Sequence, residues 1–331
     1  MGPHSAGGRR RARTRAAGLV LFLVLLASAC GPAEPPKPPP KVDAIFDVPR
    51  EYRVFNALPC AEGAGLVYVV SKAGDLYSFQ PEAREFKRIG ELKCPSDSGA
   101  KPNSMAVDRS GTAWVNYGDG ALFRVSTRDA SCEPTDFEPH QHDFSRVGMA
   151  FATTGRDLME ETLFVWGGSR SRRKPSKASS NKPAKRANRH GPRPGLGLAS
   201  IDRESLELTP IGDDRGRLSV RQAELTGTGE GKLYGFFSTR PATLAEIEPQ
   251  TGFTQKARGL KQVLTGRAWA FSFWGGDFWF FWAPRGKTSN VSRLSGRTNK
   301  VDKVLADVGF VIVGAGVSTC APTTAVSSED D

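Results

Sequence analysis

Short β-like runs separated by glycine turns recur between Lys41 and the C-terminus, and this repeat is the feature that most constrains the fold. Residues 65–92, "GLVYVVSKAGDLYSFQPEAREFKRIGEL", predict three strands, and residues 104–137 repeat the pattern. Further units begin at Gly148, Leu218 and Ala268. Units of about 40 to 50 residues with a four-strand rhythm indicate an all-β protein of the β-propeller class. A β-sandwich is the alternative.

Two segments at the ends of this region form an incomplete further unit. Residues 310–322, "FVIVGAGVSTCAP", supply inner strands with nothing after them, and residues 44–55, "AIFDVPREYRVF", supply a strand pair with nothing before it. Joining the two predicts about six four-stranded blades, the last one closed by N- and C-terminal strands, which removes an open sheet edge. The propeller would span residues 44–322, and residues 323–331 would form a disordered acidic tail.

One stretch carries a family resemblance. Residues 102–127, "PNSMAVDRSGTAWVNYGDGALFRVST", resemble blades of the NHL, gluconolactonase and virginiamycin-lyase type propellers, in which "AVD..G..W" and "G.L.RID" mark successive strands. The resemblance covers about Ala44 to Pro322 and supports a fold rather than a function. Gluconolactonase-like propellers hold a divalent cation in the central channel, so the resemblance implies Asn103, Asn116 and Asp108 as candidate ligands. No complete ligand set matches that family.

Histidines offer a second candidate metal site. "HQHD" places His140, His142 and Asp143 together between the second and third units, and alternation in an extended segment would put both histidines on one side. A virginiamycin-lyase-like site would need a histidine base, for which these two are the only candidates. An exposed polar loop is the simpler interpretation.

The N-terminus has the pattern of a secretory signal. Five arginines between Arg9 and Arg15 precede an apolar run from Ala16 to Ala27, which is shorter than the roughly 20 residues of a membrane-spanning helix. The cysteine that follows, Cys30, makes the segment resemble a bacterial lipoprotein signal, with Ala27 where that family usually has leucine. The resemblance implies cleavage after residue 29 and acyl chains such as palmitate on Cys30. An ordinary signal peptide with a chance cysteine is the alternative.

Residues 30–43 would then form a lipidated cysteine and a proline-rich linker, since "GPAEPPKPPPK" cannot form a core. Gly31 shows no acidic retention signal, which favours the outer membrane of the cell envelope. Membrane contact would be made through the N-terminal lipid.

The positive charge of the chain is concentrated in one segment. Residues 169–194 contain ten basic residues and no acid, whereas the whole chain has a net charge of +11. Leaving out these ten residues and the five signal arginines gives a net charge of −4 for the remainder. We expect a disordered, solvated insertion. Contact with polyanions outside the cell is the alternative, and nucleic acid is not expected because no aromatics interleave with the charges.

Four cysteines remain besides Cys30, namely Cys60, Cys94, Cys132 and Cys320. An even number in an exported chain favours two disulfides, for which three pairings can be drawn. Closure of the ring by both termini predicts a bond between Cys60 and Cys320. Cys94 and Cys132 follow similar points of the first two units and would form the other bond.

The most aromatic stretch is "FSFWGGDFWFFW", residues 271–282. Its Gly275-Gly276 pair predicts a tight hairpin turn between two strands, and near-continuous apolar flanks predict a sheet covered on both faces. The alternative is that Trp274 or Trp279 is exposed at the rim as a stacking surface for a sugar or a partner side chain.

The sequence contains no GxSxG motif, P-loop or dinucleotide fingerprint. It therefore favours a non-enzymatic function without a cofactor: a membrane-tethered envelope lipoprotein whose propeller binds a protein or glycan partner. The alternative is a metal-dependent propeller hydrolase or lyase with one divalent cation in the central channel.

Overall fold

The computed structural model describes residues 60–96, 98–154, 160–168, 195–212 and 216–325. Within these ranges every regular element is a β-strand except one short 3₁₀ turn, η1 (Gln141–Asp143). Among the same residues, no helix has the length and apolar character needed to cross a membrane. The all-β prediction is confirmed.

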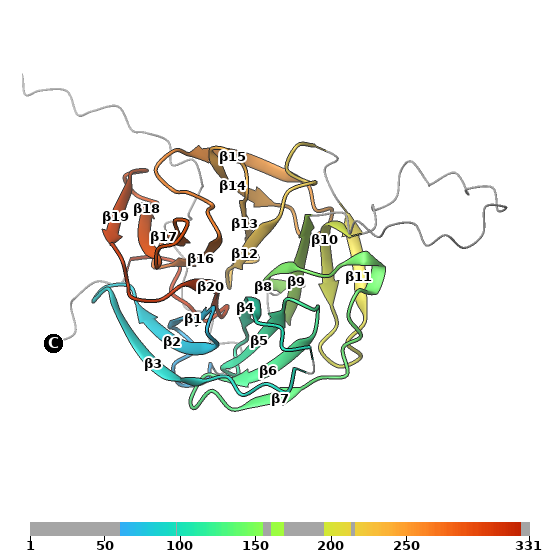
Figure 1. Cartoon of the computed structure of the whole chain (residues 1–331). Helices are drawn as coiled ribbons and strands as arrows, with labels where there is room; N and C mark the ends of the chain where they lie inside the picture. The colour runs from blue at the N-terminus through green and yellow to red at the C-terminus, as the bar shows by residue number, and fades with distance from the viewer. Residues whose placement is uncertain (1–59, 97, 155–159, 169–194, 213–215, 326–331) are drawn as a thin grey trace, which may run out of the picture. The chain divides into compact units, whose positions relative to one another are not determined.

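Twenty strands form five antiparallel four-stranded sheets, arranged as the blades of a propeller (Figure 1). From the innermost strand outward, blade one comprises β20 (Ile312–Val317), β1 (Val67–Ser71), β2 (Asp75–Gln80) and β3 (Glu85–Glu91). Blade two comprises β4 (Pro102–Val107), β5 (Thr112–Tyr117), β6 (Leu122–Ser126) and β7 (Cys132–Pro134). Blade three, again from the innermost strand outward, comprises β8 (Val147–Thr154), β9 (Glu160–Gly168), β10 (Leu196–Ile201) and β11 (Leu208–Gly212).

Blade four comprises β12 (Ala223–Gly227), β13 (Leu233–Phe237), β14 (Ala242–Ile247) and β15 (Thr254–Leu260), and blade five comprises β16 (Ala268–Trp274), β17 (Asp277–Ala283), β18 (Asn290–Ser295) and β19 (Val301–Leu305). Blade three contains the basic segment between β9 and β10, and the two strands still pair, with Gly168 opposite Leu196. Residues 169–194 themselves lie outside the described residues.

The prediction of about six blades was wrong, because the last segment does not start a blade of its own. Strand β20 pairs with β1, with Val317 opposite Val67, and so supplies the innermost strand that the first sequence unit lacks. Closure by a C-terminal strand was therefore predicted correctly, but it completes blade one. The proposed N-terminal strands, residues 44–55, lie outside the described residues.

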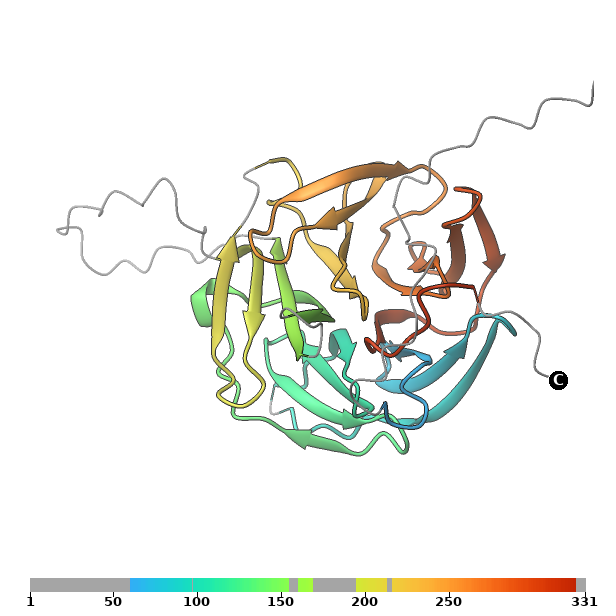
Figure 2. The same cartoon turned by 180° about the vertical axis from the view of Figure 1, so that it is seen from behind.

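The five innermost strands, β20, β4, β8, β12 and β16, surround the centre of the ring (Figure 2). Glycines allow two of them to approach closely. A Cβ atom on Gly148 of β8 would overlap the carbonyl oxygen of Ala223 on β12, and one on Gly227 would overlap the carbonyl oxygen of Phe151. Since a methyl group has no room at either contact, the narrow centre of the ring depends on glycine there.

Aromatic side chains fill the spaces between the blades. Phe278 of blade five packs edge-on against Tyr234 of blade four, with ring centroids 4.9 Å apart, whereas Phe281 packs against Phe79 of blade one at 5.5 Å. The Gly275-Gly276 turn joins β16 to β17 with both glycines at positive φ, as a two-residue hairpin requires. The aromatic stretch is thus the core between three blades, as predicted.

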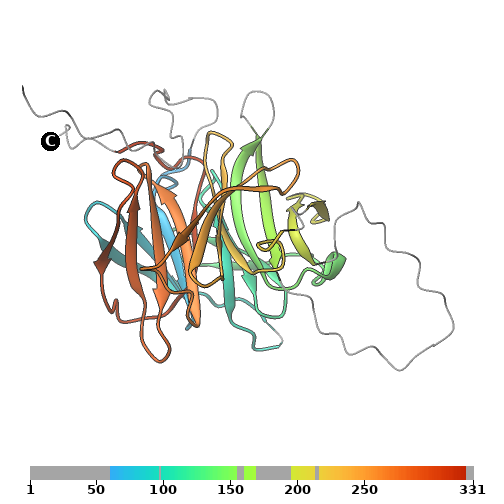
Figure 3. The ribbon, with the colours of Figure 1, turned by 90° about the horizontal axis from the view of Figure 1, so that it is seen from above.

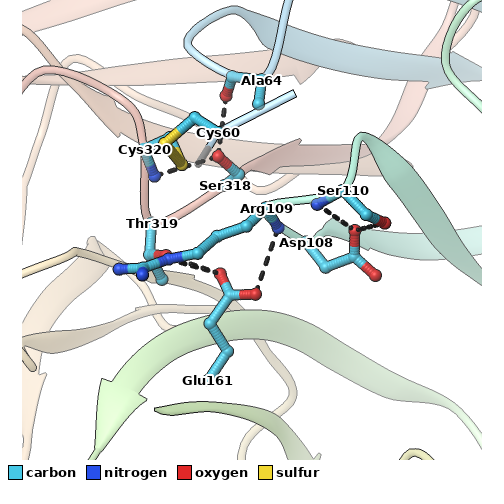
Figure 4. The surroundings of a disulfide bond; sticks show 9 residues. All are labelled: Cys60, Ala64, Asp108, Arg109, Ser110, Glu161, Ser318, Thr319 and Cys320. Carbon is cyan, nitrogen blue, oxygen red and sulfur yellow. Dashed lines mark hydrogen bonds and ion pairs between the residues drawn. A yellow bond between two sulfur atoms is a disulfide. The ribbon is translucent and has the colours of Figure 1, made fainter. Parts of the chain in front are cut away.

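Two disulfides join the chain at points far apart in sequence. Cys60 bonds to Cys320, 260 residues away, and Cys94 bonds to Cys132, 38 residues away. These are the pairs expected from the repeat pattern. The first bond links the residue where the described chain begins to the segment after β20, and Figure 4 shows the Ser318 hydroxyl donating nearby to the carbonyl of Ala64 at 2.7 Å.

The disulfide that closes the ring should contribute more to stability than the second one. In the chain-entropy model, loops of these lengths correspond to about 5.5 kcal/mol for Cys60–Cys320 and about 4 kcal/mol for Cys94–Cys132. We therefore expect Cys60→Ala/Cys320→Ala to lower the free energy of unfolding more than Cys94→Ala/Cys132→Ala does, as measured by urea denaturation. A larger loss for the Cys94–Cys132 variant would contradict this assignment.

Candidate functional site

The ring has two faces that differ in which ends of the innermost strands they expose (Figure 3). We call the face where these strands begin the mouth face; their first residues are Pro102, Val147, Ala223, Ala268 and Ile312. We call the opposite face, where they end, the closure face. It carries the Cys60–Cys320 disulfide, because Cys320 follows the end of β20.

A cavity of about 1140 Å³ opens on the mouth face, at the entrance of the central channel. Its wall is formed by the residues that lead into the innermost strands and by the loops that join the second and third strands of the blades. Channel mouths of this kind are where propellers present several loops to one ligand. This cavity is the candidate functional site.

Five cationic side chains line the cavity: Lys72, Lys101, Arg146, Arg267 and Lys287. Three of them immediately precede innermost strands β4, β8 and β16, whereas Lys72 and Lys287 lie in loops of blades one and five. All five are exposed. None forms an ion pair with a carboxylate among the described residues.

Glu224 of β12 lies at the inner end of the cavity and is 7% exposed. The Ser104 hydroxyl on β4 donates to its Oε2 at 2.5 Å, which connects blades two and four across the channel. Burial raises the pKa of the Glu224 carboxyl well above its usual value, and the hydrogen bond from Ser104 acts in the opposite direction. The inner end of the cavity is therefore polar but favours a neutral carboxyl group.

Trp269 lines the wall of the cavity on the blade-five side. Its indole Nε1–H is buried and has no hydrogen-bond acceptor among the described residues. A buried indole donor without an acceptor is uncommon in folded proteins.

The asparagines expected to hold a metal behave differently from each other. Asn103 lines the cavity, but its amide nitrogen donates to Asn116 Oδ1 at 3.3 Å and to the carbonyl of Val147 at 3.1 Å. Asn116 is 2% exposed and donates to the carbonyl of Ala121 at 3.3 Å. The pair thus joins blade two to blade three, and these bonds use their amide groups for structure.

Asp108 does not face the cavity. It lies in the β4–β5 turn on the closure face, where its carboxylate accepts the backbone N–H of Ser110 at 2.9 Å and of Thr112 at 3.0 Å. The indole of Trp114 donates to its other oxygen at 3.1 Å. The "AVD..G..W" pattern is therefore a turn in which aspartate binds the backbone and the tryptophan.

The histidines are also placed differently from the prediction. Gln141, His142 and Asp143 form a 3₁₀ turn directly after His140, rather than an extended segment, so the expected alternation is wrong. Both histidines are exposed. Within the described part of the chain, no group of three or more His, Cys, Asp or Glu side chains has the arrangement of a metal site.

Neither of the predicted stacking tryptophans is exposed at the rim. Trp274 is 9% and Trp279 is 3% exposed, and their indoles donate to the carbonyls of Gly65 and Trp274 respectively, at 2.7 and 3.3 Å. The alternative of a stacking surface is therefore wrong and the leading prediction of core packing is confirmed, because propeller hairpins bury both faces between neighbouring blades. Trp269, five residues before Trp274 on β16, lines the cavity, and so does Trp166 of β9.

A second polar cluster lies on the closure face, beside the disulfide (Figure 4). Arg109 donates through Nε to the Thr319 hydroxyl at 2.7 Å, and Thr319 donates to Glu161 Oε1 at 2.5 Å. The backbone N–H of Arg109 donates to the other Glu161 oxygen at 3.1 Å. Because its groups are paired with one another and link blades one, two and three, this cluster has a structural role.

The five cations of the cavity were missed at the sequence level, although a signal for three of them exists. Aligning the sequence units by their first strands places Lys101, Arg146 and Arg267 at the same position, one residue before an innermost strand. Charges that occupy one position of a repeat meet around the axis of a propeller.

No family model and no curated protein matches the sequence. Solved structures with a similar fold include a chain of a nidogen/laminin complex, at 10% identity and a TM-score of 0.45, over 78% of this chain and 99% of that chain. A protein of unknown function from Bacteroides thetaiotaomicron is similar at 12% identity and a TM-score of 0.45, over 76% of this chain and 58% of that chain.

TolB from Acinetobacter baumannii is similar at 11% identity and a TM-score of 0.37, over 73% of this chain and 53% of that chain. Similarity at this level carries no argument about function. The assignment of the chain as a five-bladed β-propeller rests on its own strand topology.

The buried carboxyl group of Glu224 predicts a pH-dependent stability. The pKa of Glu224 is raised in the folded protein. The contribution of this residue to the free energy of unfolding is therefore fully present below the ordinary pKa of a glutamate, and it decreases as the pH rises toward the pKa in the folded state. Glu224→Gln should therefore be more stable than the wild type at pH 7 to 8, with the difference disappearing near pH 4. Urea denaturation across this range measures it, and parallel pH profiles for the two proteins would contradict the buried placement.

Proposed function

We propose that this chain is a membrane-tethered lipoprotein of the cell envelope, acylated at Cys30 after removal of residues 1–29. Its propeller binds a protein or glycan partner on the mouth face and catalyses no reaction. The observation that carries the proposal is the position of the cavity, on the face opposite the one where the described chain begins at Cys60.

A tether from Cys30 to Cys60 would join the propeller at the closure face, where Cys60 is bonded to Cys320. Thirty residues can span at most about 100 Å when fully extended, so the mouth face could reach well beyond the lipid surface. The cavity would open away from the point of attachment, which suits capture of a partner.

The two disulfides support a location outside the cytoplasm, since such bonds form and persist in oxidising compartments. Residue 31, directly after Cys30, is glycine and not an acidic residue, which supports placement in the outer membrane over the inner one. Acylation and outer-membrane placement are parts of the proposal.

Lipid attachment is tested by labelling cells with a clickable palmitate analogue. The wild-type chain should be labelled, and Cys30→Ala should lose the label because it lacks the acceptor sulfur. Ser28→Ala, a neighbouring change that keeps the cysteine, should retain it. Labelling of Cys30→Ala at the wild-type level would refute acylation at this position.

Partner binding on the mouth face is tested with a photo-crosslinking amino acid at one of two equally exposed positions. Leu264 lies in the loop before β16 on the mouth face, and Phe253 lies in the β14–β15 turn on the closure face; both are 55% exposed. A crosslinker at position 264 should yield an adduct in intact cells that is absent at position 253. Adducts of equal yield at both positions, or at position 253 alone, would contradict the proposal.

A further inference from the structure

The proposed function leaves the chemistry of the partner open. We propose that the mouth cavity binds an acidic peptide segment of a partner protein, with the carboxylates of the segment among the five cations and an apolar side chain of the segment on the adjacent rim. This inference rests on the proposed binding role and adds the ligand class.

The five cations of the cavity are distinguished by lining one opening together. Several cations elsewhere on the fold are held by carboxylates. Arg88 pairs with Asp75 at 2.6 Å, Arg293 with Asp277 at 3.2 Å and Lys256 with Glu246 at 3.2 Å. The cavity cations have no carboxylate partner within the described ranges, and neither do Lys87 and Arg128, but only the cavity cations are gathered at one opening. Outside its basic segment the propeller, residues 44–322, has 29 basic and 30 acidic residues, so this gathering is local and does not reflect a basic fold. Cations gathered without partners around one opening form a field that attracts carboxylates.

The acids of the cavity offset only part of this field. Asp119 and Asp307 accept hydrogen bonds from neutral donors, namely Ser98, the backbone N–H of Ala121 and Thr288, and they count as two negative charges against five positive ones. Burial favours the neutral form of Glu224. The cavity therefore keeps a positive balance at neutral pH.

Exposed apolar side chains on the mouth face favour a peptide over a polysaccharide. Only three large hydrophobic side chains are exposed among the described residues, and two of them, Val220 and Leu264, lie on the mouth face. Val220 lies in the loop leading to β12 and Leu264 in the loop leading to β16, on either side of blade four. Aliphatic side chains add affinity for apolar residues of a protein, whereas a uronic acid polymer offers them little.

The size of the cavity also fits a segment of a polymer. At about 1140 Å³ it exceeds the roughly 300 to 1,000 Å³ typical of small-molecule sites. The Glu224–Ser104 hydrogen bond crosses the channel at its inner end. A side chain or a short loop of the partner could enter from the mouth face.

The test uses the purified full chain and a display library of random peptides, followed by titration of the selected peptides by fluorescence anisotropy. Selected peptides should combine Asp or Glu with Leu, Ile, Val or Phe. Lys101→Glu/Arg267→Glu should weaken their binding by about thirtyfold or more, because two attractions become repulsions. Raising the salt concentration should weaken binding of the wild type.

The matched control is Lys87→Glu/Arg128→Glu, which changes the net charge equally at two exposed residues outside the cavity, on β3 and in the β6–β7 turn. It should bind the peptides as the wild type does. Thermal unfolding of both variants verifies that each is folded. A separate change, Leu264→Ser, should reduce affinity without altering the salt dependence.

Selection of neutral or basic peptides, or equal losses in the two double variants, would overturn the inference. Binding that survives Lys101→Glu/Arg267→Glu but disappears when residues 169–194 are deleted would assign the attraction to the basic segment and overturn it as well. An alginate oligosaccharide could also bind the wild type and lose affinity in Lys101→Glu/Arg267→Glu while no peptide shows this behaviour. Such a result would show that the ligand class is wrong. In that case a crosslinked partner at position 264 would leave the proposed binding role standing.

Discussion

Completion of blade one by β20 is the interaction on which the rest of the structure depends. The first sequence unit provides only three strands, so the ring would have a gap between blades two and five without the C-terminal strand. Pairing of β20 with β1 fills that gap, and the Cys60–Cys320 disulfide fixes the segment that follows. Arg109, Thr319 and Glu161 then join this segment to blades two and three.

Closure at one face determines what the other face can do. Five innermost strands held close together bring the residue before each strand to one opening, where Lys101, Arg146 and Arg267 meet. Glycines at the contact between β8 and β12 keep that opening narrow enough for Glu224 to reach Ser104 on β4. The cationic cavity is thus a consequence of the same packing that closes the ring.

The repeat pattern predicted the fold class, the Gly275-Gly276 hairpin and the disulfide partners because each depends on local turn chemistry or on chain connectivity. It overcounted the blades because a lone strand does not reveal which sheet it joins. It left rim exposure of Trp274 or Trp279 open as an alternative because burial there depends on contacts between blades, and it did not show that His142 lies in a 3₁₀ turn. The cavity residues were missed for a related reason: they come from separate units and converge only around the axis.

The most direct test of this account is native-state hydrogen exchange of the intact protein. If β20 is the innermost strand of blade one, the amides of Ile312–Val317 should exchange as slowly as those of β4 and β12, through global unfolding alone. Rapid exchange across Ile312–Val317, with β4 and β12 still protected, would show that the C-terminal strand frays as a chain end. That result would contradict a ring closed by β20.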